Sequence, residues 1–135
     1  MIIGYTAGVF DLFHSGHVNL LKAAKSLCDK LVVGVSSDEI ALYKNKKPII
    51  KFQERKVVVE SCRYVDCVVG QYDLDKYAAY KKIGFDILFV GDDWYGKGQW
   101  NDLEEKIKPA KIIFLPYTKS VSSTIINNFL EKERD

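Results

Sequence analysis

Five short apolar runs recur along the chain, and this recurrence constrains the fold more than any other feature. The runs span residues 2–7, 31–35, 65–69, 86–90 and 111–115. They are nearly continuous in apolar residues rather than alternating, which is typical of strands covered on both faces. Helical patterns fill the gaps between them. In a chain of 135 residues, this alternation predicts one α/β domain over residues 1–135, a doubly wound five-stranded parallel sheet.

The helical segments carry start signals and inward-facing positions. Ser15 is expected to cap the first helix, and Ser36 and Ser37, just before two acidic residues, indicate the start of the second. Residues 52–62 are predicted to form a helix whose Val57 and Val58 face the core.

Charge and composition exclude several classes of protein. Twenty basic and eighteen acidic residues leave a net charge of +2, too little for a domain that coats nucleic acid or an anionic membrane. No apolar run approaches the ~20 residues of a membrane span, and the N-terminus lacks a signal-peptide pattern. Three cysteines without metal-ligand spacing indicate reduced thiols. We therefore expect a cytoplasmic protein without nucleic-acid or membrane partners.

The segment after the first strand, residues 8–17, holds both histidines of the chain, His14 and His17. They bracket Gly16 at the start of the first long helix, at the strand end where ligands bind in such sheets. A helix N-terminus attracts phosphate, two imidazoles add hydrogen-bond donors, and Gly8 and Gly16 permit close approach. The alternatives are a pair of capping or surface histidines, or a metal site that includes Asp11. The pattern favours a phosphate site.

Three further segments permit either a functional or a structural interpretation. The basic loop of residues 44–47 is either solvated or faces phosphate groups. Residues 91–94 form either an Asp- and Gly-rich turn or a contact to Mg²⁺, base or sugar. Residues 117–124 provide either an ordinary helix cap or a second phosphate site.

Residues 8–17 resemble the G-x-F-D-x-x-H-x-G-H signature of the His-x-Gly-His nucleotidyltransferase superfamily. The chain is similar nearly end to end to its cytidylyltransferases, most of all to the branch that acts on glycerol 3-phosphate. The similar segments also include residues 44–47, 54–56, 63–66, 91–94 and 122–124. The resemblance implies a Rossmann-like fold. It also implies transfer of a cytidylyl group from CTP to glycerol 3-phosphate or a similar phosphorylated alcohol, which gives CDP-glycerol and pyrophosphate.

The resemblance also implies residue roles. The catalytic residues it implies are His14, His17, Lys46 and Arg63. Those implied at the nucleotide are Gly8, Val9, Phe10, Asp11, Gly16, Asp92, Trp94, Thr118, Ser122, Ser123 and Thr124. Lys44 and Tyr77 are placed at the acceptor. Because relatives tend to have lysine where this chain has Tyr77, Lys76 is the alternative there. Arg55 is interpreted either as a further site residue or as a structural one.

Besides Tyr77, the chain departs from its relatives at three positions. Tyr117 stands where arginine is usual, Ser120 where glycine is usual, and Val9 where the glycerol-phosphate branch has threonine. Without this arginine, another positive charge has to meet the leaving pyrophosphate. Lys119, two residues after Tyr117, is the candidate.

The expected mechanism needs no nucleophile from the protein. The acceptor phosphate, with a second pKa near ~6, attacks the α-phosphate in line and without a covalent intermediate. Mg²⁺ is expected to be carried by the triphosphate, with no metal site of the protein's own. The resemblance further implies a homodimer with residues 63–66 near its interface, and a role in making a teichoic acid or capsule precursor.

Other functions stay open. One is transfer to another acceptor, such as phosphocholine or phosphoethanolamine, or transfer from ATP, since nothing in the residues themselves selects cytosine over adenine. The other is a nucleotide-binding module with weakened catalysis.

Overall fold

The computed structural model describes residues 1–92, 100–116, 126 and 128–130. Its strands are β1 (Ile3–Gly8), β2 (Lys30–Ser36), β3 (Cys67–Gln71), β4 (Ile87–Gly91) and β5 (Lys111–Leu115). Its helices are α1 (Ser15–Ser26), α2 (Asp38–Tyr43), α3 (Phe52–Glu60), α4 (Lys76–Ile83) and α5 (Trp100–Ile107). The expected alternation of strands and helices is confirmed.

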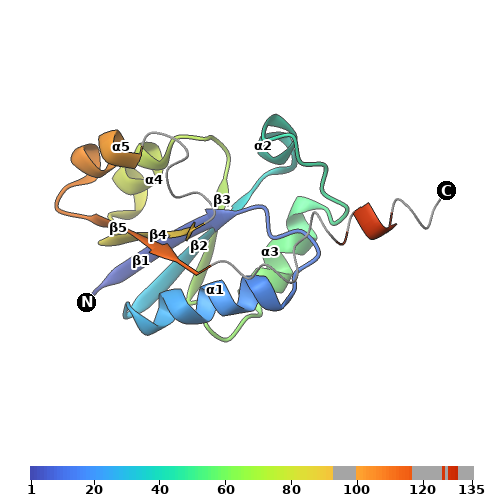
Figure 1. Ribbon diagram of the computed structural model, residues 1–135, viewed down its shortest axis with the longest axis horizontal. Helices are drawn as coiled ribbons and strands as arrows, with labels where there is room; N and C mark the ends of the chain where they lie inside the picture. The colour runs from blue at the N-terminus through green and yellow to red at the C-terminus, as the bar shows by residue number, and fades with distance from the viewer. Residues whose placement is uncertain (93–99, 117–125, 127, 131–135) are drawn as a thin grey trace.

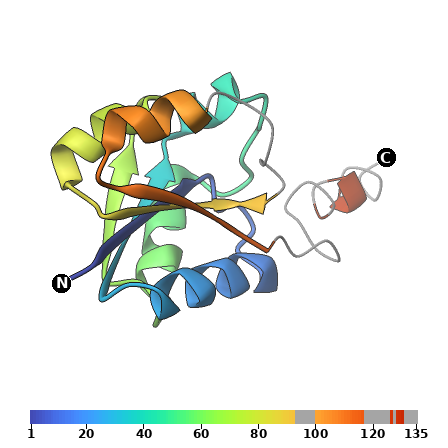
Figure 2. The ribbon, with the colours of Figure 1, turned by 60° about the vertical axis from the view of Figure 1, so that its left-hand side comes forward.

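The five strands form one parallel sheet in the order β3-β2-β1-β4-β5. The views in Figures 1 and 2 place α1 and α3 on one face of the sheet and α4 and α5 on the other. This is the predicted doubly wound, Rossmann-like arrangement. The direction of winding reverses between β1 and β4, so their carboxyl ends form the topological switch point where such sheets bind ligands.

Each face of the sheet buries its own apolar cluster. Under α1 and α3 the buried residues include Leu21, Ala24, Val33, Val59 and Phe89. Under α4 and α5 they include Tyr5, Val32, Ala79, Leu88 and Ile107. Full burial of each large apolar side chain contributes about 1.5–3 kcal/mol. The core therefore holds both helical layers against one rigid sheet.

The helix α3 differs from its prediction. It ends at Glu60 instead of residue 62, and the side chains of Val57 and Val58 are 63% and 44% exposed. Its buried positions are Arg55 and Val59, one helical turn apart. The inward face was misjudged because an arginine occupies a core-facing position, which apolar periodicity cannot reveal.

Other elements also differ from the sequence-based expectation. The strand β3 begins at Cys67, two residues late, and the Asp66 carboxylate just before it accepts hydrogen bonds from the Leu31 N–H and the Lys25 ammonium. The helix α5 was not anticipated. The cap of α1 is His14 and not Ser15. Within the described ranges, no helix combines the length and apolar character that a bilayer span requires.

Candidate active site

The connection between β1 and α1 is a tight loop at the switch point. Phe10 and Leu12 adopt left-handed backbone angles, with φ of 54° and 50°, which cost of order 1–3 kcal/mol each in a non-glycine residue. The ring of Phe10 is buried in the core. It lies so close to Gly8 that a Cβ there would come within 3.1 Å of it. The packing of the buried Phe10 ring against Gly8 therefore fixes the conformation of the loop, which begins with the backbone of Gly8 and Val9.

The two histidines form a reciprocal cap on α1. The Nδ1 of His14 accepts the Gly16 N–H at 3.0 Å, and the Nδ1 of His17 accepts the His14 N–H at 3.2 Å. Their rings stack with centroids 3.9 Å apart. Because both Nδ1 atoms accept hydrogen bonds, each neutral imidazole carries its proton on Nε2. The structure therefore confirms that the two histidines cap the helix, and the cap leaves the Nε2–H of each neutral ring as its donor.

The surroundings keep both imidazoles uncharged. Burial lowers the pKa of His14; burial, and then the nearby His14 and Lys46 side chains, which disfavour a further positive charge, lower the pKa of His17 to about 3. The Nε2 of His14 is buried and has no hydrogen-bond partner among the described residues. A buried donor without a partner costs about 1–3 kcal/mol. The pair thus offers neutral N–H donors at a helix N-terminus, a combination suited to phosphate oxygens.

The low pKa of His17 predicts a pH-dependent stability. Between pH 6.5 and about 3 the unfolded chain binds a proton that the folded chain does not, so stability falls as the pH falls through this window. At pH 4.5 the expected loss due to His17 is about 2–3 kcal/mol. His17→Gln keeps a capping side chain at this position but does not titrate.

The measurement is urea unfolding of the wild-type protein and His17→Gln at pH 7 and pH 4.5. The wild-type protein should lose about 2–3 kcal/mol more than the variant across this interval. Equal losses in both proteins would show that His17 does not resist protonation in the folded state.

The basic loop after α2 lies beside the histidines. The positive charge of Lys46 acts on His17 and on Lys44. Lys44 caps the end of α2 and donates to the Ser36 hydroxyl, at the carboxyl end of β2, over 3.1 Å. Lys46 is exposed and Lys44 partly buried. The structure therefore brings the lysines predicted to meet phosphates to the same edge of the sheet as the histidines.

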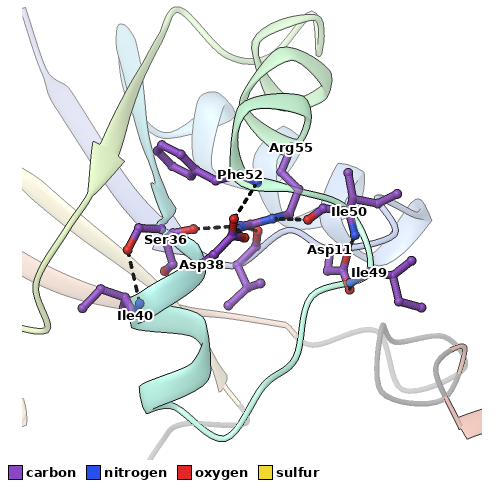
Figure 3. Close-up of polar contacts among 10 residues, drawn as sticks. Asp11, Ser36, Asp38, Ile40, Ile49, Ile50, Phe52 and Arg55 are labelled. Carbon is purple, nitrogen blue, oxygen red and sulfur yellow. Dashed lines mark hydrogen bonds and ion pairs between the residues drawn. The ribbon is translucent and has the colours of Figure 1, made fainter.

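Arg55 braces this edge from beneath, as Figure 3 shows. Its guanidinium donates to the Val9 carbonyl at 2.6 Å and the Ser36 carbonyl at 2.8 Å. It also donates to the Ile50 carbonyl at 2.8 Å and pairs with the Asp38 carboxylate at 2.7 Å. With a side chain only 1% exposed, Arg55 is structural, the second of the two interpretations considered.

Asp11 makes a second tie across the same edge (Figure 3). Its two carboxylate oxygens accept the N–H groups of Ile49 and Ile50, each at 2.9 Å. The contacts join the loop after β1 to the segment that leads into α3. The described contacts of Asp11 therefore fix the loop after β1 against the segment before α3, and its contact to nucleotide stays a prediction.

The remaining predicted residues fall in three places. Asp92 is exposed and follows β4 directly, at the switch point. Arg63 lies between α3 and β3, at the amino-terminal edge of the sheet, and its guanidinium contacts the Tyr64 ring and hydroxyl. Within one chain it is therefore not brought to the histidines. Trp94, Thr118, Ser122, Ser123 and Thr124 lie outside the described residues, as do Tyr117, Lys119 and Ser120.

Tyr77, which the resemblance places at the acceptor, contacts side chains of its own helix and the apolar cluster beneath it. It packs against the cluster under α4 and α5, with its ring centroid 6.5 Å from that of Tyr80. Sequence reasoning also missed Ser36 as a partner of Lys44; a hydroxyl at the carboxyl end of a buried strand was the available signal. No group of three or more His, Cys, Asp or Glu side chains arranged to hold a metal occurs in the described part of the chain.

Comparisons with known proteins agree with this geometry. Residues 5–129 match the family described as cytidylyltransferase-like. The chain is 38% identical over 122 residues to a glycerol-3-phosphate cytidylyltransferase from Bacillus subtilis (strain 168), covering 90% of this chain and 91% of that protein. It is 36% identical over 137 residues to an FAD synthase from Pyrococcus horikoshii, covering 92% and 89%.

A solved structure supports the fold assignment. The crystal structure of the lipopolysaccharide core biosynthesis protein from Thermoplasma volcanium aligns with a TM-score of 0.75 and 29% identity, over 88% of this chain and 98% of that one. A His-x-Gly-His loop at the switch point of a five-stranded parallel sheet, and a family match over most of the chain, lead to one conclusion: this chain belongs to the cytidylyltransferase-like family.

Proposed function

We propose that the protein transfers a cytidylyl group from CTP to glycerol 3-phosphate and releases pyrophosphate. The observation that carries this proposal is the histidine pair that caps α1: both Nδ1 atoms accept backbone N–H groups, so each neutral ring carries its proton on Nε2 and can donate it. The relative named glycerol-3-phosphate cytidylyltransferase supports the choice of nucleotide and acceptor.

The reaction follows from this donor set. The acceptor phosphate is mostly dianionic at neutral pH and attacks the α-phosphate directly. The reaction therefore needs no general base from the protein. Its contribution is to hold the two phosphates in line and to stabilise the negative charge that develops on the α-phosphate oxygens. His14 and His17 donate to these oxygens, and Lys46, whose charge already acts on His17, neutralises the triphosphate.

Four further features belong to this proposal. Mg²⁺ enters bound to the triphosphate, and omission of Mg²⁺ from the assay tests this. A homodimer would cover the exposed Val57 and Val58 on α3, close in sequence to residues 63–66; sedimentation of the protein and of Val58→Asp tests this assembly.

A cytoplasmic location fits three unpaired cysteines, and fractionation of cells tests this location. CDP-glycerol as a teichoic acid or capsule precursor is tested by the CDP-glycerol pool in cells lacking the protein.

The likeness to an FAD synthase favours one second candidate, transfer from ATP. Pyrophosphate release is therefore measured with CTP and with ATP, each against glycerol 3-phosphate, phosphocholine, phosphoethanolamine and FMN. We expect the highest kcat/KM for CTP with glycerol 3-phosphate. A higher value for ATP with any acceptor would replace the proposal with the second candidate. Tight CTP binding without pyrophosphate release would indicate a nucleotide-binding module.

A further inference from the structure

The imidazole of His17 packs among other aromatic rings of the loop after β1. The Phe13 ring lies nearly parallel to it, with the two centroids 5.3 Å apart and the planes at 25°. The His14 ring lies 3.9 Å away at 24°, and the Phe10 ring 5.3 Å away at 58°. Phe13 directly precedes the residue that caps α1. The loop therefore constrains the plane of the His17 ring through packing as well as through the cap.

The direction of the His17 Nε2–H depends on two constraints. The His14 N–H donates to the His17 Nδ1 at 3.2 Å and so fixes the position of one ring atom. One hydrogen bond tolerates a range of angles, and the terminal torsion of a histidine side chain is broad. A nearly parallel neighbouring ring restricts the remaining freedom, because aromatic rings prefer defined relative orientations. Once both the atom and the plane are fixed, the Nε2–H has a single direction.

Phe13 connects this constraint to the hydrophobic core. Its side chain is partly buried and packs against the apolar cluster under α1 and α3. A hydrophobic residue just before a helix cap commonly packs on the fourth residue of the helix, which is Val18 in α1. The ring of Phe13 also lies along the third residue, His17. The core therefore reaches the imidazole through Phe13.

We propose that Phe13 is a positioning residue, whose ring holds the plane of the His17 imidazole so that the Nε2–H is aimed at the α-phosphate oxygens. This assignment rests on the proposed function. The signature in residues 8–17 leaves position 13 unspecified, so the motif itself gives Phe13 no role. A ring packed on the imidazole also shields it from water, in line with the burial that lowers the pKa of His17.

The test is Phe13→Leu, which removes the flat ring but keeps an apolar side chain. We expect kcat to fall about 3- to 10-fold, the factor by which an aromatic pair shifts an equilibrium beyond its area burial. The KM values for CTP and glycerol 3-phosphate should stay within about threefold, because the aimed donor acts on charge that develops in the transition state. Phe13→Tyr keeps the ring and should keep the wild-type kcat. Phe52→Leu is the matched control, since Phe52 packs against the same cluster but its ring contacts Tyr72; its kcat should be unchanged.

A double-mutant cycle with His17→Gln separates positioning from packing. If Phe13 acts through the imidazole, Phe13→Leu should change the kcat of His17→Gln by less than about twofold, because no imidazole is left to misalign. A loss in the His17→Gln background as large as in the wild-type background would show that Phe13 acts elsewhere and would overturn the assignment. An unchanged kcat in Phe13→Leu, or an equal loss in Phe13→Tyr, would overturn it as well.

Nitrogen NMR of the imidazoles tests the same assignment without the reaction. In the wild-type protein His17 should show the Nε2–H tautomer alone, because its Nδ1 accepts the His14 N–H. Phe13→Leu should show a mixture of tautomers at His17, whereas Phe13→Tyr and Phe52→Leu should match the wild-type protein.

The NMR result also separates this assignment from the proposed function. If the wild-type protein released no pyrophosphate with any acceptor, the proposed function would fail on its own, and the imidazole signals would still decide whether Phe13 fixes the ring. A single, unchanged tautomer in Phe13→Leu would overturn the assignment. Phe13→Met, which also lacks a flat ring, takes the place of Phe13→Leu in every measurement should that variant not fold.

Discussion

Replacement of His14 by asparagine should lower the turnover number by about 10²- to 10³-fold while the protein stays folded. Asparagine is among the best N-cap residues, so its side-chain oxygen can still accept the Gly16 N–H that His14 accepts at 3.0 Å. It lacks the imidazole Nε2–H, which is buried and without a hydrogen-bond partner in the described structure. Loss of one preorganised donor to a developing charge costs about 10²–10³ in turnover.

The measurement is steady-state pyrophosphate release by the wild-type protein and His14→Asn at saturating CTP and acceptor. Ser15→Ala serves as the matched control, because Ser15 is exposed and begins the same helix without capping it. Its turnover should equal that of the wild-type protein, and the melting temperatures of all three should agree within a few degrees. A loss below tenfold in His14→Asn would remove His14 from the catalytic residues and leave it as a cap.

Replacement of Arg55 by methionine should lower the free energy of unfolding by about 3–5 kcal/mol, the typical cost of removing one partner from a buried charged network. Methionine retains most of the apolar length of the side chain. It leaves the carbonyls of Val9, Ser36 and Ile50 without the donor that joins them. The Asp38 carboxylate is 42% exposed and can turn to water, so the buried carbonyls account for most of the expected loss.

Urea unfolding of the wild-type protein, Arg55→Met and Gln53→Ala measures this effect. Gln53 is exposed on the same helix, and its replacement should change stability by less than about 0.5 kcal/mol. Arg55→Lys should recover only part of the loss, because an ammonium cannot reproduce the planar donor fork of a guanidinium. A loss of less than about 1 kcal/mol in the free energy of unfolding of Arg55→Met would show that the segments of Val9, Ser36 and Ile50 are held together without the Arg55 guanidinium.

The sheet was predictable because its signal is local. Each strand carries its own apolar run, and the order of strands and helices along the chain decides that the sheet is parallel. The histidine loop was predictable for a similar reason, since the signature occupies ten consecutive residues. The errors came from residues whose role depends on distant partners. Arg55 took a core position that Val57 and Val58 were expected to share, because its acceptors lie on β2 and two loops.

Composition and local pattern alone determined the α/β class, the placement of the loop with both histidines at a strand end, and the family membership suggested by residues 8–17. Tertiary structure decided which of the candidate side chains hold segments of the fold together. It joined Asp11 to Ile49 and Ile50, buried Arg55 among backbone carbonyls, and packed the partly buried Tyr77 against the cluster under α4 and α5. The physical reason is that spacing along the chain sets helical and strand periods, whereas charge, burial and protonation depend on groups that only folding brings within a few ångströms of each other.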